Sequence, residues 1–228
     1  MDIDGEMQMD IGSSSYPSCL SSFIDTGSLE SHRYYLSRRT VLEMLRDRGY
    51  AIPDAEIELS LQGFRDYYGE DPDVSRLRIS ASHKDDPNQK IMVIFSGPGA
   101  VKVNTVREIG SDIMNKGALS RLMLIVQKQP TSQATKALEL FPFKVEVFRI
   151  TDLLVNITKH ILKPKHQLLT PAEKQNLLEK YNVEEKQLPR MLQKDAIAQY
   201  YGLQKGQVVK ITYSSEATET RVTYRCVW

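Results

Sequence analysis

The stretch Ile91-Met92-Val93-Ile94-Phe95, followed by Ser96-Gly97-Pro98-Gly99, decides the fold class of this chain. Five consecutive apolar residues that end at a glycine–proline turn are typical of a strand buried on both faces of a sheet. A second such run, Leu122-Met123-Leu124-Ile125-Val126, follows a segment with helical spacing. Strands that alternate with helices predict an α/β domain with a mixed or parallel sheet.

The segments around these two runs continue the alternation. Leu77–Ala81 and Lys144–Arg149 alternate apolar and polar residues, as half-buried strands do. Helices are expected from an N-cap at Ser28 to about Arg48, over Leu59–Tyr68, after a cap at Asn104, and from Thr131 to about Leu140. These elements define a first domain over residues 29–152.

The pattern changes after residue 150. Thr170-Pro171-Ala172-Glu173 is a strong helix start, because it combines an N-cap, a proline in the first turn and a capping box. Asp195 can cap a short helix that ends at Gly202. Strands are expected at Lys186–Leu188, Gln207–Thr212 and Arg221–Val227, the last two forming a hairpin around the loop Ser214–Thr220. Residues 153–228 therefore predict a small α+β domain.

Composition excludes several classes of protein. The 228 residues are 41% hydrophobic and 26% charged, which is ordinary for a globular chain with a core. A membrane-spanning helix needs about 20 apolar residues, and no run approaches that length. The N-terminus lacks the pattern of a secretory signal. Cys19 and Cys226 lie at opposite ends, which suggests a reducing compartment, and the histidines and cysteines show no metal-ligand spacing.

Charge is unevenly distributed along the chain. Residues 1–28 contain five acidic residues, seven serines and no lysine or arginine, so this segment is −5 and predicts a disordered extension. It is either a dispensable tail or an arm that binds a partner. The whole chain is +1, which leaves +6 on the remainder. That mild excess is compatible with phosphate contacts made as one part of a larger assembly.

A search for catalytic motifs finds no convincing active site. Gly97-Pro98-Gly99 follows a strand, but it lacks the third glycine of a dinucleotide-binding loop. A metal-dependent nuclease needs converging carboxylates and a nearby lysine. Glu146 and Lys144 share one face of a strand, and Asp112 or Asp85 would have to supply the second acid. Nothing in the spacing fixes that geometry, so we expect no metal and no cofactor.

Several ordered motifs resemble one known family. They are Glu30-Ser31-His32-Arg33 with Met44-Leu45-Arg46-Asp47-Arg48-Gly49-Tyr50, Leu153-Leu154-Val155-Asn156-Ile157 with His160, Pro164-Lys165-His166, Gln187-Leu188-Pro189-Arg190, Tyr201–Ile211 and Tyr224-Arg225. Together they resemble the fifth subunit of eukaryotic nuclear DNA-directed RNA polymerases from about residue 29 to the end. The C-terminal stretch is also similar to a small subunit of archaeal RNA polymerases.

The resemblance implies a fold and a role. The fold would be an N-terminal jaw domain with nuclease-like topology but no active site, followed by a C-terminal assembly domain. The role would be that of a non-catalytic nuclear subunit. The assembly domain docks on the largest polymerase subunit, and the jaw lies beside downstream double-stranded DNA. Such a protein is part of a larger complex, not a homo-oligomer, and it does not bind membranes.

One stretch of the jaw matches the family's DNA-approaching turn. The common form carries Thr-Pro-x-Ala, and this chain has Thr131-Ser132-Gln133-Ala134, followed by Lys136. A helix that begins here has free N–H groups suited to a phosphate, and the lysine adds a positive charge. Thr131, Ser132 and Lys136 are the candidate nucleic-acid contacts. The alternative interpretation of Thr131 is an ordinary N-cap.

Four residues of the second domain are candidate contacts to the largest subunit, on the strength of the family resemblance. They are Pro164, His166, Pro189 and Arg190. Arg190 is the best single candidate for an interfacial ion pair, because its planar guanidinium suits a carboxylate. The alternative is structural: rigid turns, a hydrogen-bonded histidine and a solvated cation.

Departures from the common form point to a specialised paralogue. The serine in place of proline, the loop at residues 215–220 without glycine, and the acidic extension are similar to the plant RNA polymerase V form. That enzyme makes non-coding transcripts that guide DNA methylation and silencing. The alternatives are the common subunit of RNA polymerases I, II and III, a metal-dependent nuclease-fold enzyme, and a free-standing DNA-binding adaptor.

Overall fold

A mixed four-stranded sheet forms the centre of the N-terminal part of the chain. The computed structural model describes residues 25, 27–114, 119–215 and 218–228. The strands are β1 (Ile79–Ser82), β2 (Lys90–Phe95), β3 (Arg121–Val126) and β4 (Lys144–Arg149), in the order β1-β2-β3-β4. β1 runs antiparallel to β2, whereas β2, β3 and β4 are parallel. The predicted mixed α/β sheet is therefore confirmed, with the two apolar runs as its central strands.

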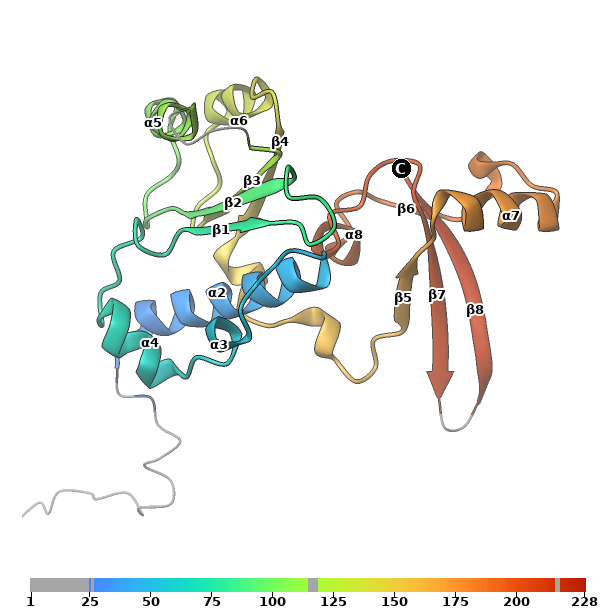
Figure 1. Ribbon diagram of the computed structural model, residues 1–228, viewed down its shortest axis with the longest axis horizontal. Coiled ribbons are helices and arrows are strands. Elements are labelled where there is room, and N and C mark those ends of the chain that lie inside the picture. Colours follow the sequence, from blue (N-terminus) through green and yellow to red (C-terminus); the bar gives the residue numbers. More distant parts are fainter. Residues whose placement is uncertain (1–24, 26, 115–118, 216–217) are drawn as a thin grey trace, which may run out of the picture.

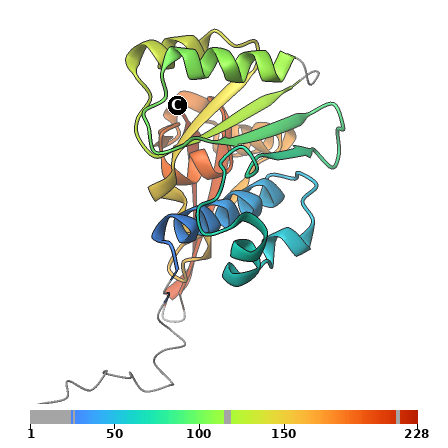
Figure 2. The same cartoon turned by 90° about the vertical axis from the view of Figure 1, so that its left-hand side faces the viewer.

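Helices cover both faces of this sheet, as Figure 2 shows. One face carries α2 (Leu29–Asp47), α3 (Asp54–Ile57) and α4 (Leu61–Tyr68), and the other carries α5 (Val103–Met114) and α6 (Ser132–Glu139). Alternate residues of β3 divide between the two cores: Met123 and Ile125 face α2, whereas Leu122 and Leu124 face α5 and α6. This explains why the strand is apolar at every position after Arg121.

A second four-stranded sheet organises the C-terminal part (Figure 1). Two 3₁₀ turns, Ile150–Leu153 and Ile157–Lys159, lead into it. The strands are β5 (Lys165–Leu168), β6 (Arg190–Met191), β7 (Val208–Ser215) and β8 (Thr218–Val227), in the order β5-β7-β8-β6. The helices are α7 (Pro171–Tyr181) and α8 (Ala196–Tyr200). This is the α+β arrangement that the sequence predicted.

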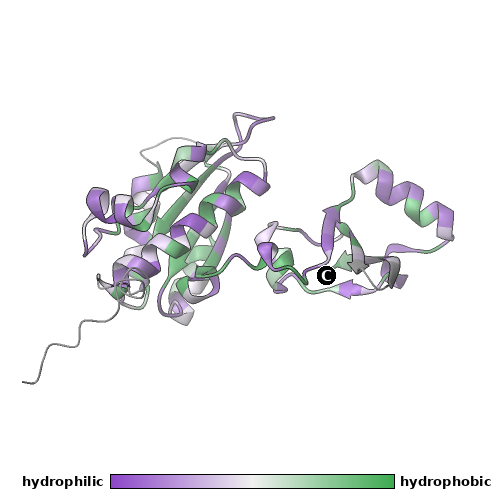
Figure 3. Ribbon diagram, turned by 90° about the horizontal axis from the view of Figure 1, so that it is seen from below, coloured by the Kyte–Doolittle hydropathy of each residue, from purple (hydrophilic) through white to green (hydrophobic). Residues whose placement is uncertain are grey.

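Helix α8 joins the two parts. The ring of Tyr200 is buried in the core formed with α2, and its hydroxyl donates a hydrogen bond to Asp47 at 2.8 Å. Arg48, just after α2, donates to the carbonyl oxygens of Gln199 (2.7 Å) and Tyr200 (2.8 Å). The contact therefore combines apolar burial with hydrogen bonds to the last carbonyl groups of α8. In Figure 3 the apolar strands and the purple outer helix faces separate clearly in the N-terminal part.

Most helix caps occur where the sequence placed them. Ser28, Thr131, Thr170 and Asp195 each accept a backbone N–H through their side chains, and Thr170 with Glu173 forms the predicted capping box. Gly202 has φ +62°, as a left-handed helix stop requires.

Two element predictions are wrong, and several short elements are unpredicted. Asn104 is the second residue of α5 and not its cap, since the helix begins at Val103. Lys186–Leu188 is not a strand, because Glu185–Gln187 forms a 3₁₀ turn in which Gln187 caps back on Glu184. The helix α3 and the short strands β5 and β6 have no expectation in the sequence analysis.

The hairpin of β7 and β8 is longer than predicted. Pairing extends from Val208↔Cys226 to Ser215↔Thr218, with a bulge between Tyr213 and Ser215. The tip, residues 216–217, lies outside the described residues. Residues 1–24 and 26 of the predicted N-terminal extension, which include Cys19, also lie outside the described residues. In the described part of the chain, no helix is long and apolar enough to cross a bilayer.

Candidate nucleic-acid and subunit interfaces

The first candidate site is the start of helix α6. The Thr131 hydroxyl accepts a hydrogen bond from the Ala134 N–H at 3.2 Å, so Thr131 is an N-cap. Its own N–H donates to the Val101 carbonyl at 3.1 Å, which ties the start of α6 to the loop after β2. The N–H groups of Ser132 and Gln133 lie in the first turn, where an α-helix supplies no acceptor. The structural and phosphate-binding interpretations of this turn are thus compatible.

Lys136 lies one turn further along the same helix. Ala134 and Leu138 are the buried side chains of α6, and Lys136 is exposed on the side turned away from them. Thr131 and Ser132 are also exposed. The three predicted nucleic-acid contacts therefore belong to one solvent-facing segment, and Lys136 can reach an anion without breaking any core contact.

Three further cations, which the sequence analysis missed, lie along this edge of the sheet. Lys102 and Lys128 are exposed in the loops after β2 and β3, and these loops are joined by a parallel bridge between Ala100 and Lys128. Arg149 ends β4, and its guanidinium lies beside the side-chain amide of Gln129. The carboxyl ends of parallel strands meet at one edge, and that rule would have grouped these cations with Thr131.

The second candidate site contains Pro164 and His166, beside and on strand β5. His166 pairs with Ile211 of β7, and its Nδ1 donates to the Pro164 carbonyl at 2.8 Å. Burial lowers the pKa of His166 from its ordinary value, although the Pro164 carbonyl opposes that shift. A neutral imidazole therefore closes a small turn at the edge of the second sheet.

Pro189 and Arg190 lie at the opposite edge of that sheet. The Pro189 carbonyl accepts from the Cys226 N–H at 2.8 Å, and Arg190 pairs in parallel with Cys226 as part of β6. The Arg190 guanidinium carbon lies 4.4 Å from the Trp228 ring centroid, and Lys205 covers the same ring at 5.3 Å. Because β5 and β6 are the two outer strands, the structure does not bring the four predicted partner residues together.

An apolar surface between the two sheets has no counterpart in the sequence analysis. Val155 (72% exposed), Ile161 (93%) and Leu162 (82%) project from the linker. Val155 and Leu162 line a hollow together with Lys159 and Lys163, and Lys159 pairs with buried Glu43 of α2. The sequence of this linker does show apolar residues among lysines and histidines. Their exposure, however, depends on the two 3₁₀ turns, which the sequence pattern did not predict.

The carboxylates of the nuclease alternative lie apart. Glu146 of β4 is 10% exposed and pairs with Arg48 at 2.9 Å and Arg121 at 3.2 Å, with Lys144 at 3.7 Å. Asp112 of α5 instead pairs with Arg78 at 2.8 Å, and Asp85 is an exposed loop residue beside His83. Within residues 25, 27–114, 119–215 and 218–228, no cluster of three or more potential metal ligands occurs.

Comparisons with known proteins agree with this two-part architecture. The model described as RNA polymerase Rpb5, N-terminal domain, matches residues 28–113, and the model described as RNA polymerase Rpb5, C-terminal domain, matches residues 155–227. The chain is 58% identical over 210 residues to DNA-directed RNA polymerase V subunit 5A of Arabidopsis thaliana, covering 92% of this chain and 95% of that protein.

Two other relatives cover similar shares of the chain. DNA-directed RNA polymerases IV and V subunit 5B of Arabidopsis thaliana is 57% identical, over 90% of this chain and 94% of that protein. The subunit RPABC1 of RNA polymerases I, II and III of Caenorhabditis elegans is 36% identical, over 87% of this chain and 97% of that protein. The chain therefore belongs to the RNA polymerase Rpb5 family, and it is a subunit of a multisubunit DNA-directed RNA polymerase.

Proposed function

We propose that this chain serves RNA polymerase V in the plant nucleus. The observation that carries the proposal is the difference in identity: 58% to the Arabidopsis thaliana RNA polymerase V subunit 5A, against 36% to the subunit shared by polymerases I, II and III in Caenorhabditis elegans. As a subunit of that enzyme, the chain would take part in the non-coding transcription that serves RNA-directed DNA methylation and gene silencing. The common fifth subunit is the alternative within the same family.

We assign residues 153–228 as the assembly domain that docks on the largest subunit. Support comes from Val155, Ile161 and Leu162, which expose apolar area that an isolated soluble surface rarely gathers in one place. Pro164 with His166 and Pro189 with Arg190 form the two outer edges of the second sheet. A partner that contacts both pairs would have to extend across that sheet.

We assign residues 29–152 as a jaw beside downstream DNA, with nuclease-like topology. The start of α6 supports a phosphate contact, because exposed Thr131 and Ser132 and the cation Lys136 adjoin the edge that carries Lys102 and Lys128. Such contacts position a duplex without reading its sequence. Proline is therefore not needed for the geometry: Ser132 begins the helix with its own N–H available.

The same domain would be non-catalytic. Glu146, the acid that the nuclease alternative places beside Lys144, forms ion pairs with Arg48, Arg121 and Lys144. A carboxylate neutralised in this way is unsuited to hold a divalent cation. Its role is to hold Arg48, which in turn donates to the carbonyl oxygens of Gln199 and Tyr200 in α8.

Affinity purification of the tagged full chain from plant nuclear extract, followed by mass spectrometry, tests the proposal. Recovery of the largest subunit of RNA polymerase V is the expected result. Recovery of the largest subunits of polymerases I, II and III in its place would keep the family and reject the specialisation. Magnesium- or manganese-dependent cleavage of duplex DNA by the purified chain would reject the non-catalytic assignment.

A further inference from the structure

A groove along strand β4 has no role in the proposed function. Residues 144–148 of the strand line one wall, and the chain around α8, between Gln193 and Leu203, lines the other. Consecutive residues of a strand point to opposite faces of its sheet, so a groove that touches all of them follows the edge of the strand. β4 is an outer strand of the first sheet, and among the described residues its ladder partner is β3 alone. The groove therefore lies along the free edge of β4.

The backbone of β4 has unused hydrogen-bonding groups on this side. In a parallel ladder, alternate residues direct their N–H and C=O groups toward one neighbour, and the residues between them direct theirs to the opposite side. Among the described residues, no backbone hydrogen bond joins β4 to the segment 193–203. A side-chain contact does cross the groove, where the Lys144 Nζ lies 3.5 Å from the Gly202 carbonyl oxygen. An outer edge with free backbone groups is a template for another extended chain.

The dimensions of the groove favour an extended segment over a helix. It encloses about 250 Å³ beside five consecutive strand residues. Neighbouring strands lie about 4.8 Å apart, and each strand residue extends about 3.3 Å. An α-helix with its side chains is about 10–12 Å across. The narrow space beside β4 therefore suits one extended stretch of roughly four residues.

The groove carries more positive than negative charge. Its charged lining residues are Lys144, Glu146 and Lys194. Glu146 is already paired with Arg48 at 2.9 Å and Arg121 at 3.2 Å, so its carboxylate does not compensate both lysines. Lys194 is exposed, and the described ion pairs around Glu146 do not include it. An acidic occupant is therefore favoured over a basic one.

Two further observations support this excess of positive charge. Asp195, which follows Lys194 in the sequence, uses its carboxylate to cap the backbone of α8. Burial lowers the pKa of Lys144, and the charges of Arg121 and Arg48 add to that shift, although the neighbouring carboxylate opposes it. A carboxylate supplied from outside would favour the charged form of this lysine.

The lining also offers apolar contacts. Val147 is 37% exposed, and Val145 and Leu203 line the groove beside it. We propose that an extended acidic segment of another polymerase subunit adds to the first sheet along β4, with a carboxylate toward Lys144 and Lys194. Strand addition of this kind gains affinity from main-chain hydrogen bonds and specificity from alternate side chains. It requires that the chain is a polymerase subunit, but not that the polymerase is RNA polymerase V.

Hydrogen–deuterium exchange with fragmentation that resolves single amides tests the backbone pairing. The full chain alone is compared with the purified polymerase that contains it. In the free chain, the β4 amides that bond to β3 should be protected, and the alternate amides, which face the groove, should exchange fast. In the polymerase, we expect the groove-facing amides to exchange at least about tenfold more slowly.

The amides that bond to β3 are the internal control of this experiment. General stabilisation of the chain by assembly would slow both sets of β4 amides, whereas strand addition slows the groove-facing set selectively. Equal slowing of both sets would therefore overturn the proposal. Unchanged exchange of the groove-facing amides would also overturn it, and would leave Lys144 as a lysine that blocks pairing at an outer strand.

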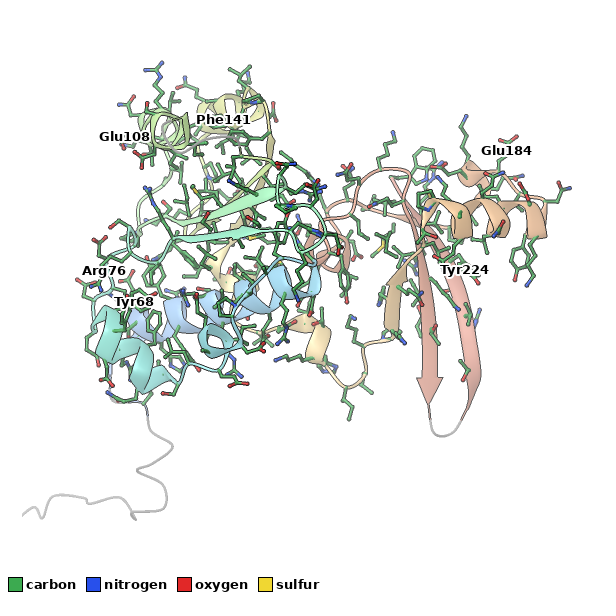
Figure 4. All side chains as sticks on the ribbon, viewed as in Figure 1. Tyr68, Arg76, Glu108, Phe141, Glu184 and Tyr224 are labelled. Atoms are coloured by element: carbon green, nitrogen blue, oxygen red, sulfur yellow. The ribbon has the colours of Figure 1, made fainter. Side chains whose placement is uncertain are left out.

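Site-specific photocrosslinking tests the chemistry of the occupant. p-Benzoylphenylalanine replaces Gln193, an exposed residue of the groove wall, and the assembled polymerase is purified and irradiated. We expect a crosslink to another subunit, with an aspartate or glutamate within about three residues of it. Glu108 is the control position, because it is exposed on α5 and lies away from α8 (Figures 1 and 4). A crosslink from position 193 to this same chain, or to a segment without acidic residues, would overturn the proposal.

Charge variants connect the two measurements. Lys194→Glu reverses an exposed charge of the groove, so it should lower the crosslink yield at least about threefold and speed exchange of the groove-facing amides in the polymerase. Lys194→Gln should give a smaller change in the same direction. Lys186→Glu, at an exposed lysine outside the groove lining, is the matched control and should change neither quantity. No effect of Lys194→Glu, or an equal effect of the two reversals, would overturn the acidic chemistry of the occupant.

Discussion

The Thr131 hydroxyl satisfies one N–H group of helix α6, and its stability contribution can be separated from its proposed DNA contact. Replacing Thr131 with alanine removes the hydrogen bond to Ala134 and should lower the free energy of unfolding by about 1 kcal/mol. Urea titration of the purified chain measures this value. Gln133→Ala is the matched control in the same turn and should change stability by less than about 0.5 kcal/mol. A Thr131→Ala value no larger than the control would contradict the capping role.

Glu43 gives a pH dependence whose sign the structure fixes. Burial alone would raise the pKa of this carboxyl, but hydrogen bonds from Asn156 and Lys159 outweigh it and the pKa is lowered. Because the folded pKa is below the unfolded one, the stabilisation is present above the ordinary pKa and is lost as pH falls through the folded value.

Removal of that charge should therefore flatten the acid limb of the stability curve. Glu43→Gln is expected to cost about 2 kcal/mol near neutral pH, since it weakens charge-assisted hydrogen bonds. Its stability should then fall less than that of the wild type between pH ~6 and pH ~3. Urea titrations across this range measure both effects, with exposed Glu108→Gln as control. Parallel curves for wild type and Glu43→Gln would contradict the assignment.

Arg190 is a residue whose exposure the sequence predicts but whose contact in the folded chain it does not. Its exposure was predictable from its type, and the ion-pair hypothesis followed from the shape of a guanidinium. Its partner in the folded chain is the ring of Trp228, which comes close only because β6 lies parallel to the end of β8. No local pattern encodes that pairing, because β6 has only two residues.

Elements that carry their own signal were predictable, and elements that depend on a distant partner were not. The apolar runs of β2 and β3 are buried by helices on both faces, and the capping box of α7 is complete within four residues. Strand β5, in contrast, has a mostly exposed pattern and exists through its pairing with β7. The four predicted partner residues lie beside or on β5 and β6, and the positions of these strands depend on pairing with distant strands. The sequence alone therefore could not show that the four residues lie at two opposite edges of the second sheet.

The contact between α8 and the N-terminal part relies on Arg48. Its side chain is 4% exposed and pairs with Glu146 at 2.9 Å. Arg48→Met should cost about 3 kcal/mol, because it leaves a buried carboxylate with fewer partners and loses the hydrogen bonds to Gln199 and Tyr200. The double variant Arg48→Met/Glu146→Met should cost less than the sum of the single variants.

Urea unfolding of the four proteins in this cycle gives the coupling energy directly. Arg46→Met, in the last turn of α2, is the matched control, since Arg46 pairs with Asp54 at 3.7 Å on the surface and should contribute less than about 1 kcal/mol. Strict additivity of the Arg48 and Glu146 variants would contradict a direct coupling between Glu146 and the arginine that contacts α8.

At the scale of the whole molecule, charge is separated between segments. The net charge of +1 conceals an acidic segment, residues 1–28, at one end and +6 on the remainder. Exposed lysines that adjoin the start of α6, Lys102 and Lys128, lie on the edge of the first sheet where its parallel strands end. Positive charge is thus available for a phosphate backbone at this edge, although the net charge of the whole chain is small.

Substitution of Lys136 in the assembled polymerase tests whether the positively charged edge at the start of α6 contacts DNA. Each phosphate contact contributes about 0.9 to the slope of log K against log salt on duplex DNA. Lys136→Gln should therefore weaken retention of the downstream duplex and reduce the steepness of that slope by up to ~0.9. Lys186→Gln, an exposed lysine of the C-terminal part, is the matched control and should leave both quantities unchanged. Because salt dependence counts released counterions, a purely structural effect of Lys136 would lower affinity without altering the slope. An unaltered slope would therefore remove Lys136 from the contact set, even if the duplex were held less tightly.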